Sequence, residues 1–425
     1  MEDEKYVEIE IRISTMGTIN EIYRNAKNND FKIIYFNFGP KDEDCFFIKS
    51  IDNHIERIKS HLDFNPEKGD EILFKIRKSL KSINYEIINP ILEYKISSRE
   101  YDNNYLNNKI WYIIKSLKNY DEGNNQSYSL NKNDIIKLGK KKYIVDELHI
   151  LFEKEKETIK DDNCEKNNSI GYISSINKKS KTILNIDIKA NQYLINKNNN
   201  FISNAPKRCF ICQISYSDIN NPLICLCDCD NFFHYECLKK HLSDKIIIME
   251  NSKKTVTTYR CEKFNCDKCL KPYPLRFRIP EFNKIYKLID LIFPEETDYI
   301  CLESLDFPKD NNKIKTIHIA KIIDEEIAIG AGNSNDIIDN DISISSEHAL
   351  LRYNKNKGKL FLEDKNGKSD TLVLVRGNIK IIEEKIFFQN GNTIISFELK
   401  KIKISKNYSS NLIPDNANND DNNSK

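Results

Sequence analysis

Residues 209–241 read CFICQISYSDINNPLICLCDCDNFFHYECLKKH, and residues 266–269 read CDKC. Together with Cys261, these two stretches hold nine of the chain's twelve cysteines. The spacing defines four groups: Cys209-x2-Cys212, Cys225-x-Cys227-x-Cys229, His234-x2-Cys237 and Cys266-x2-Cys269. Turns this short let two soft side chains reach one tetrahedral ion at about 2.0–2.3 Å, which suits zinc. Four such pairs predict two zinc ions.

A disulfide framework is the main alternative for so many cysteines. Such frameworks belong to secreted chains, and the N-terminus, Met1-Glu-Asp-Glu-Lys5, is charged and lacks an apolar signal-peptide segment. We therefore expect thiolate ligands and a cytoplasmic or nuclear protein. No apolar run approaches the roughly 18–20 residues that cross a bilayer, so we expect no membrane association.

The charges of the chain are almost balanced. It has 66 Lys+Arg and 64 Asp+Glu, a net charge of +2, so we expect no nucleic-acid partner. The sequence contains no P-loop, no Gly-rich nucleotide motif and no Ser/His/Asp arrangement. Intrinsic hydrolase, kinase or redox activity is therefore not expected, and we assign no catalytic residue.

The order of the four pairs permits two interpretations, and in both of them the first pair joins the third. Over roughly Cys209–Pro274 the chain resembles a RING-CH (RING-variant) finger, a small cross-brace module with two zinc ions. Besides the ligand order, the resemblance is carried by Asn221-Pro-Leu-Ile224, Cys237-Leu-Lys-Lys-His-Leu242 and Lys271-Pro-Tyr-Pro274. It implies that one ion is held by the first and third pairs and the other by the second and fourth. The implied ligands are Cys209, Cys212, Cys227, Cys229, His234, Cys237, Cys266 and Cys269, with Cys225 spare.

A PHD finger is the alternative resemblance. The stretch Cys229-Asp-Asn-Phe-Phe-His-Tyr-Glu-Cys237 is similar to that family, and Cys225-x3-Cys229-x4-His234 fits its spacing better. Phe264, two residues before Cys266, is also typical of it. This alternative makes Cys225 a ligand in place of Cys227 and implies a reader of histone tails. In either case Cys261 is expected to be a buried or spare thiol.

The RING-CH resemblance implies a soluble ubiquitin ligase. Such a ligase holds a ubiquitin-conjugating enzyme that carries ubiquitin, and it forms no covalent intermediate itself. The contact surface in this family uses an apolar residue inside the first cysteine pair and an aromatic residue, often Trp, on the following helix. Ile211 and His241 occupy these positions. Because His241 replaces the aromatic anchor, a non-enzymatic adaptor that only mediates protein–protein binding stays open as the alternative. We expect the helix over Tyr235–Met249.

Residues 299–405 resemble a forkhead-associated (FHA) β-sandwich. The resemblance rests on Ile329-Gly330-Ala331-Gly332, the signature Ser345-x-x-His348, and Thr371-Leu-Val-Leu-Val375. The family binds phosphothreonine peptides, but Ala331 stands where it has an Arg, and Ser369-Asp370 replace its Asn-Gly. Ser345 is kept, Lys368 offers a charge close by, and His348 is expected to be architectural. We expect a degenerate site and a protein partner bound without phosphate.

The sequence as a whole predicts a multidomain α+β protein. Residues 1–155 have strand-like runs at Tyr6–Ile13, Phe31–Phe38, Glu71–Ile76 and Ile135–Val145, and helix-like runs at Asn53–Leu62 and Tyr105–Leu117. They predict a mixed α/β region of unknown role. The remaining segments are a low-complexity linker at 156–206 with one strand at Thr182–Ile188, the zinc finger at 207–279, a connecting helix at 280–298 (over Pro280–Phe293), the FHA sandwich at 299–405 and a disordered tail at 406–425.

Overall fold

The structure is a computed structural model. It describes residues 4–14, 32–38, 45–49, 55–58, 71–78, 85–88, 110–114, 127–151, 207–227, 229, 231–279, 284–305, 314–365, 367–375, 379–380, 386–391 and 393–405. In this part of the chain nearly all regular structure is β-strand, with one α-helix, α3 (Tyr235–Ser243), and one 3-10 turn, η7 (Lys355–Lys357). No helix among these residues has the length and apolar character needed to span a bilayer.

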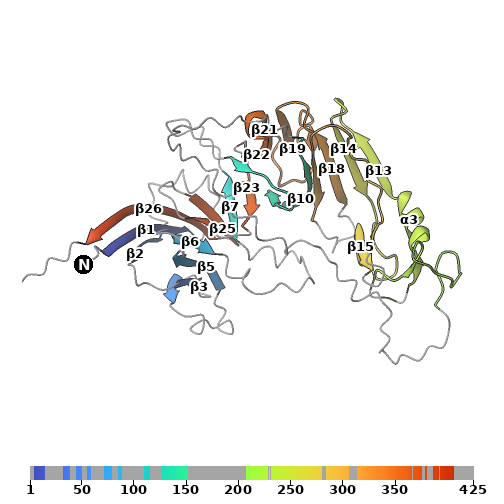
Figure 1. Ribbon diagram of the computed structural model, residues 1–425, viewed down its shortest axis with the longest axis horizontal. Coiled ribbons are helices and arrows are strands. Elements are labelled where there is room, and N and C mark those ends of the chain that lie inside the picture. Colours follow the sequence, from blue (N-terminus) through green and yellow to red (C-terminus); the bar gives the residue numbers. More distant parts are fainter. Residues whose placement is uncertain are drawn as a thin grey trace, which may run out of the picture.

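The largest sheet of the described residues has twelve strands, which extend across the molecule (Figure 1). All its neighbouring strands are antiparallel. The order is β13 (Ile246–Glu250), β14 (Val256–Cys261), β18 (Lys315–Lys321), β17 (Tyr299–Ser304), β10 (Lys141–His149), β9 (Ile135–Leu138), β23 (Thr371–Leu374), β7 (Ile110–Ile114), β25 (Ile386–Asn390), β26 (Thr393–Ser405), β1 (Glu4–Ser14) and β2 (Lys32–Phe38).

Two five-stranded sheets accompany the large sheet. The first has the order β20 (Ile337–Ile338), β19 (Glu326–Gly330), β21 (Ala349–Asn354), β22 (Lys359–Asp364) and β8 (Tyr128–Ser129). The second has the order β24 (Ile379–Lys380), β6 (Tyr85–Ile88), β5 (Glu71–Lys78), β3 (Cys45–Lys49) and β4 (Ile55–Ile58). Two small ribbons pair β11 (Leu223–Ile224) with β12 (Phe233–His234), and β15 (Arg276–Ile279) with β16 (Lys284–Lys287).

Apolar side chains from the large sheet and both smaller sheets share one core. Leu351 and Leu362 of the first small sheet belong to the same buried cluster as Ile136 of the large sheet. Between the second small sheet and the large sheet, the ring of Phe74 on β5 packs edge-on against Phe397 on β26, with 4.9 Å between ring centroids. Each small sheet therefore covers one part of the large sheet, as in a β-sandwich.

The predicted mixed α/β character of residues 1–155 is not confirmed, since the described elements of this region are strands. The helix predicted over Tyr105–Leu117 is wrong. Its centre is β7, whose five residues are all buried between β23 and β25. A central strand is apolar on both faces, so its short run of apolar residues cannot be told from a helix by periodicity.

The helix predicted over Asn53–Leu62 is wrong as well, because Ile55–Ile58 form β4 and pair with β3. The three other strand-like runs fall on β1, β2 and β5. The run Ile135–Val145 is divided into β9 and β10 by a turn at Gly139, whose φ of 59° lies in the left-handed region.

Two helices predicted around the cysteine stretch are also corrected. The helix over Tyr235–Met249 ends at Ser243, and the β-branched run that begins at Ile246 continues as β13. Within Pro280–Phe293, residues 284–287 form β16 instead of a helix, because the buried ring of Tyr286 stacks on Phe277 of β15, with 5.3 Å between centroids.

Strand pairing crosses the predicted segment boundaries. β14 of the cysteine-rich region pairs with β18, and β10 of the N-terminal region pairs with β17. The linker at 156–206, its strand at Thr182–Ile188 and the tail at 406–425 lie outside the described residues.

Candidate metal centre

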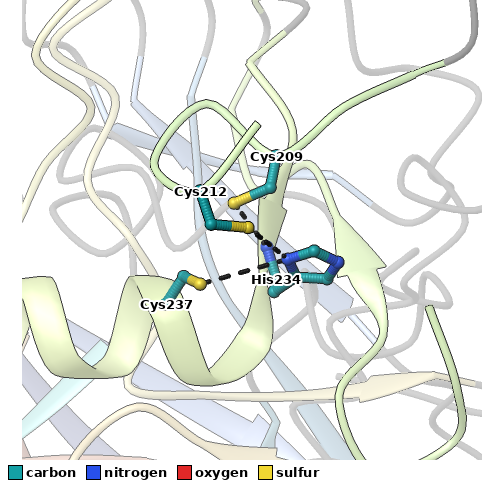
Figure 2. A group of neighbouring side chains, drawn as sticks. All are labelled: Cys209, Cys212, His234 and Cys237. Atoms are coloured by element: carbon teal, nitrogen blue, oxygen red, sulfur yellow. Dashed lines mark hydrogen bonds between the residues drawn. The ribbon is translucent and has the colours of Figure 1, made fainter. Parts of the chain in front are cut away.

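The first predicted group comes together at the start of α3 (Figure 2). Cys209 and Cys212 lie on the turn before β11, His234 closes β12, and Cys237 lies in the first turn of α3. The Cys212 sulfur is 3.2 Å from His234 Nδ1, and the Cys237 sulfur is 4.0 Å from the same nitrogen. All four ligand atoms lie within 4.8 Å of one another.

The second group consists of Cys227, Cys229, Cys266 and Cys269. The Cys229 sulfur lies 3.0 Å from that of Cys227, 3.4 Å from that of Cys266 and 3.6 Å from that of Cys269. The four pairs thus combine in the interleaved order, first with third and second with fourth. That these residues hold metal ions stays a prediction.

The separations in both groups suit a tetrahedral ion better than disulfides. A sulfur–sulfur bond is about 2.05 Å long, well below the separations found here, and the cysteines are free thiols. Ligands about 2.0–2.3 Å from a tetrahedral centre lie roughly 3.3–3.8 Å from one another. Thiolates packed this closely, three in the first group and four in the second, repel each other, so a divalent cation is the group that balances each set.

Two of the four pairs lie on turns with the same backbone hydrogen bonds. The amide of Gln213 donates to the carbonyl of Cys209 (2.8 Å), and the amide of Leu270 donates to that of Cys266 (2.8 Å). Gln213 and Leu270 have φ values of 62° and 58°. This conformation is uncommon for residues other than glycine and is found where surrounding structure requires it. We call these two turns, Cys209–Gln213 and Cys266–Leu270, the first and the second knuckle.

The knuckles close with a second matching bond. The amide of Cys209 donates to the carbonyl of Ile214, and the amide of Cys266 donates to that of Lys271, each over 2.9 Å. The two stretches share little sequence beyond their cysteines, so the common backbone reflects a common requirement, which is to direct two sulfurs toward one point.

Backbone amides favour the ionised form of one thiol in each group. Burial disfavours thiolates at Cys209 and Cys266, but amide donors outweigh it and lower the pKa of Cys209 to about 7 and that of Cys266 to about 6. For Cys266 these donors are the amides of Cys269 and Lys268, within its own knuckle. Burial raises the pKa of Cys237 to about 12, and the neighbouring Cys209 adds to this.

The imidazole of His234 is oriented by a carbonyl behind it. His234 Nε2 lies 2.5 Å from the carbonyl oxygen of Tyr216, to which it donates. Nδ1 is then the acceptor that faces the sulfurs (Figure 2). A histidine metal ligand is held in the same way, with its second nitrogen bonded to a carbonyl or carboxylate.

Cys225 and Cys261 belong to neither group. The Cys225 thiol donates to the carbonyl of Cys229 over 2.9 Å, so it lies beside the second group without joining it. Cys261 is buried on β14. The second group therefore contains Cys227 and not Cys225, and the assignment of these residues as metal ligands stays a prediction.

Charged side chains attach the cysteine-rich region to the large sheet. The guanidinium of Arg276 on β15 bonds the carboxylate of Asp146 on β10, and its Nη2 lies 3.7 Å from a carboxylate oxygen of Glu303 on β17. Both carboxylates are buried. Sequence analysis missed these residues, because their partners are more than a hundred positions apart in the case of Arg276 and Asp146.

The two residues expected to contact a conjugating enzyme are accessible. Ile211 lies in the first knuckle and is 44% exposed. His241 lies in the last turn of α3, and its Nε2 is 3.8 Å from a carboxylate oxygen of Asp267 in the second knuckle. Leu270, at the matching end of the second knuckle, is 49% exposed and was not singled out from the sequence.

The loops predicted to bind phosphopeptide are brought together at one end of the sandwich. The amide of Ala331 donates to the carbonyl of Ser345, and the amide of Lys368 donates to the hydroxyl of Ser345 over 2.7 Å. Gly330 permits this approach, because a Cβ there would lie 2.2 Å from the carbonyl oxygen of Ser346. Ser369 is half-buried and follows the exposed Lys368 directly.

Two further residues define this end of the sandwich. His348 is fully buried, and its Nδ1 accepts a hydrogen bond from the amide of Ser345. Lys137 on β9 lies over the Trp111 ring at 5.7 Å; burial lowers its pKa, and the charge of Asp370 raises it. Lys137 was missed because it lies in the N-terminal region, far from Asp370 in sequence.

Comparison with known proteins identifies one part of the chain. Residues 327–397 match the FHA domain family, which agrees with the resemblance found in the sequence. No curated protein and no solved structure matches the chain. The chain therefore contains an FHA domain, a protein-interaction domain, together with two cysteine-rich groups that could hold metal ions.

Proposed function

We propose that the protein is a zinc-dependent RING-type ubiquitin ligase. In this proposal the knuckle region binds a ubiquitin-conjugating enzyme, and the FHA domain binds a protein partner. The observation that carries it is the interleaved combination of the four ligand pairs, with both knuckles in the same backbone conformation. Closed four-ligand sites leave no open coordination position, so zinc would act as scaffold and not as catalyst.

The contact with the conjugating enzyme is assigned to Ile211. Its side chain is exposed because the sulfurs on either side of it point inward to the first group. An apolar side chain on a turn made rigid by metal ligands loses little conformational entropy on binding, which favours its use as an anchor. Leu270 offers a second such side chain on the second knuckle.

His241 is the feature that favours the second candidate, a non-enzymatic adaptor. It takes the place of the family's aromatic anchor, and its imidazole faces the carboxylate of Asp267. Loss of a buried aromatic anchor costs about 2 kcal/mol or more, over tenfold in affinity. Ile211 and Leu270 must therefore supply most of the binding energy if the ligase proposal is right.

The FHA domain is assigned to a partner bound without phosphate. Ala331 cannot supply the charged hydrogen bond of the family's Arg, which is worth about 1.5–3 kcal/mol. The Ser345 hydroxyl accepts from Lys368, so its proton remains for one bond to a ligand. Lys137 offsets part of the charge of Asp370 but is itself half-buried against Trp111.

Auto-ubiquitination of the purified, zinc-loaded chain across a panel of conjugating enzymes tests the ligase proposal. The controls are Cys229→Ser, which removes a metal ligand, and the pair Ile211→Ala and Ile292→Ala. Ile292 is 74% exposed, so its replacement matches that of Ile211 in kind but lies outside the knuckles.

We expect chains from the wild type and from Ile292→Ala, at least about tenfold fewer from Ile211→Ala, and none from Cys229→Ser. A folded protein that carries two zinc ions and forms no chains with any conjugating enzyme would reject the ligase in favour of the adaptor.

Titration with a phosphothreonine peptide library tests the assignment of the FHA domain. We expect no binding that depends on the phosphate group. Micromolar binding that is lost on dephosphorylation would contradict the assignment.

A further inference from the structure

The strands on either side of the β7–β23 pair follow the same order. On one side the large sheet continues β23, β9, β10, β17, β18; on the other it continues β7, β25, β26, β1, β2. The small sheets also correspond: β8, β22, β21, β19, β20 matches β24, β6, β5, β3, β4. Only the last strand of each differs in direction, since β20 is parallel to β19 and β4 is antiparallel to β3.

Register at the junction has two-fold symmetry. Tyr112 of β7 lies opposite Val373 of β23, and the flanking pairs are Ile113 with Leu372 and Trp111 with Leu374. A two-fold axis through the central pair therefore maps β7 onto β23 and each flanking pair onto the other. Any antiparallel pair has such an axis, but here it extends to the flanking strands, because Phe388 of β25 lies opposite Tyr112 as Ile136 of β9 lies opposite Val373.

Matching details occur away from the axis. The hairpins β9–β10 and β25–β26 both turn through two residues, and the first is a glycine with positive φ: Gly139 at 59° and Gly391 at 54°. The next strand pairs, β10–β17 and β26–β1, each contain a register shift, between Val145 and Glu147 and between Glu8 and Ile9.

Chain order shows that three strands change places. In sequence, β8, β9 and β10 follow β7, yet they complete the sandwich of β17–β23; β24, β25 and β26 follow β23, yet they complete the sandwich of β1–β7. The FHA match over residues 327–397 begins in β19 and ends in β26, so it covers strands of both sandwiches. The strands that match the FHA family, which would normally form one sandwich, are here divided between two.

We infer that the chain contains two sandwiches of the FHA type, encoded by residues 4–149 and 299–405, which exchange their three C-terminal strands within one molecule. The N-terminal region is then a second interaction domain, and the cysteine-rich region is an insertion between the two repeats. Exchange within one chain costs little, because the same inter-strand contacts form and only the donor segment differs. The two sandwiches are thereby fixed to one another.

Two core substitutions in the full-length chain test the exchange. Phe397→Ala removes a ring on β26 that packs against Phe74, and Ile136→Ala removes a buried side chain on β9. Amide hydrogen exchange read by mass spectrometry then reports which strands lose protection. Phe397→Leu and Ile136→Val serve as milder versions should either alanine variant unfold throughout.

We expect Phe397→Ala to accelerate exchange in residues 4–14 and 71–78 by about a hundredfold, while residues 326–364 change little. Ile136→Ala should give the reverse pattern. Loss of protection in residues 326–364 with Phe397→Ala, or equal loss in both sandwiches with the mild variants, would overturn the inference, because it would place β26 with the strands that precede it in sequence.

Discussion

The cysteine-rich region and the paired sandwiches are stabilised in different ways. The sandwiches bury long runs of Ile, Leu, Val and Phe from strands far apart in sequence. The cysteine-rich region has a smaller apolar cluster, to which its own cysteines Cys227, Cys261 and Cys266 contribute. Small modules that cannot bury enough apolar surface commonly rely on metal ions.

This difference also decides what each part tolerates. A ligand position needs one side-chain type at one point, whereas a core position needs only a suitable volume. In the knuckles, Gln213 and Leu270 adopt positive φ, which lets the two cysteines of each knuckle point toward one centre. The sandwiches keep the same strand order twice, although the FHA signature stands in one of them alone. Metal removal and core substitution should therefore affect different parts of the molecule.

The largest effect is expected from Cys266→Ser. Cys266 is fully buried at the start of the second knuckle, and its sulfur lies 3.4 Å from that of Cys229. Loss of a structural zinc site removes on the order of 10 kcal/mol of apparent folding energy. We expect the zinc count to fall and residues 209–277 to lose their exchange protection, while the strands at 327–374 keep theirs. Metal analysis and hydrogen exchange on the same sample check this; equal loss of protection in the sandwiches would remove the distinction.

A smaller effect, in the other part, is expected from Leu351→Ala. Leu351 is fully buried on β21, opposite Ile327 on one side and Leu362 on the other. Such truncations cost about 2–5 kcal/mol. Urea unfolding should show this loss, whereas the number of bound zinc ions should stay at two. Release of zinc by this substitution would show that the two parts are not independently stabilised.

Acid should weaken the sheet through His318. This residue is buried on β18, 2.9 Å from the Thr258 hydroxyl and beside the ring of Tyr143, with Asp339 and Lys141 as the nearby charges. Burial lowers the pKa of His318 to about 4. The folded protein therefore excludes a proton that the unfolded chain binds below about pH 6.5.

The free energy of unfolding keeps the full contribution of neutral His318 above pH 6.5, and this contribution is lost as the pH falls toward 4. We expect a slope of about 1.4 kcal/mol per pH unit in this window. His318→Gln should reduce the slope measured by urea unfolding between pH 6.5 and 5, and an unchanged slope would exclude His318 as its source. Zinc release at acid pH is recorded separately by metal analysis.

The smallest effect is expected from Cys225→Ser. The Cys225 thiol donates weakly to the carbonyls of Cys229 and Cys227, and a serine hydroxyl can do the same. Two zinc ions should stay bound, and stability should change by less than about 1 kcal/mol. Cys227→Ser, by contrast, should release one ion. The opposite result would make Cys225 the ligand, as the PHD alternative requires.

Sequence reasoning identified the cysteine groups and the FHA sandwich because both depend on local patterns. Ligand spacing is a short-range signal, and the resemblance to a cross-brace finger implied the combination of His234 with the first cysteine pair. The helix predicted around Ile110 failed because a strand buried on both faces has no period. The strand exchange could not be foreseen, since the sequence alone does not say which sandwich β9 or β26 completes.

Native mass spectrometry of the purified full-length chain is the most direct test of the central claim, that two zinc ions hold the cysteine-rich region. The account predicts a mass increase of two zinc ions with the thiols of both groups deprotonated. It also predicts that a strong chelator exposes residues 209–277 to hydrogen exchange and leaves residues 327–374 protected. A metal-free chain with residues 209–277 fully protected, or a mass showing disulfides among the seven cysteines of the two groups, would contradict it.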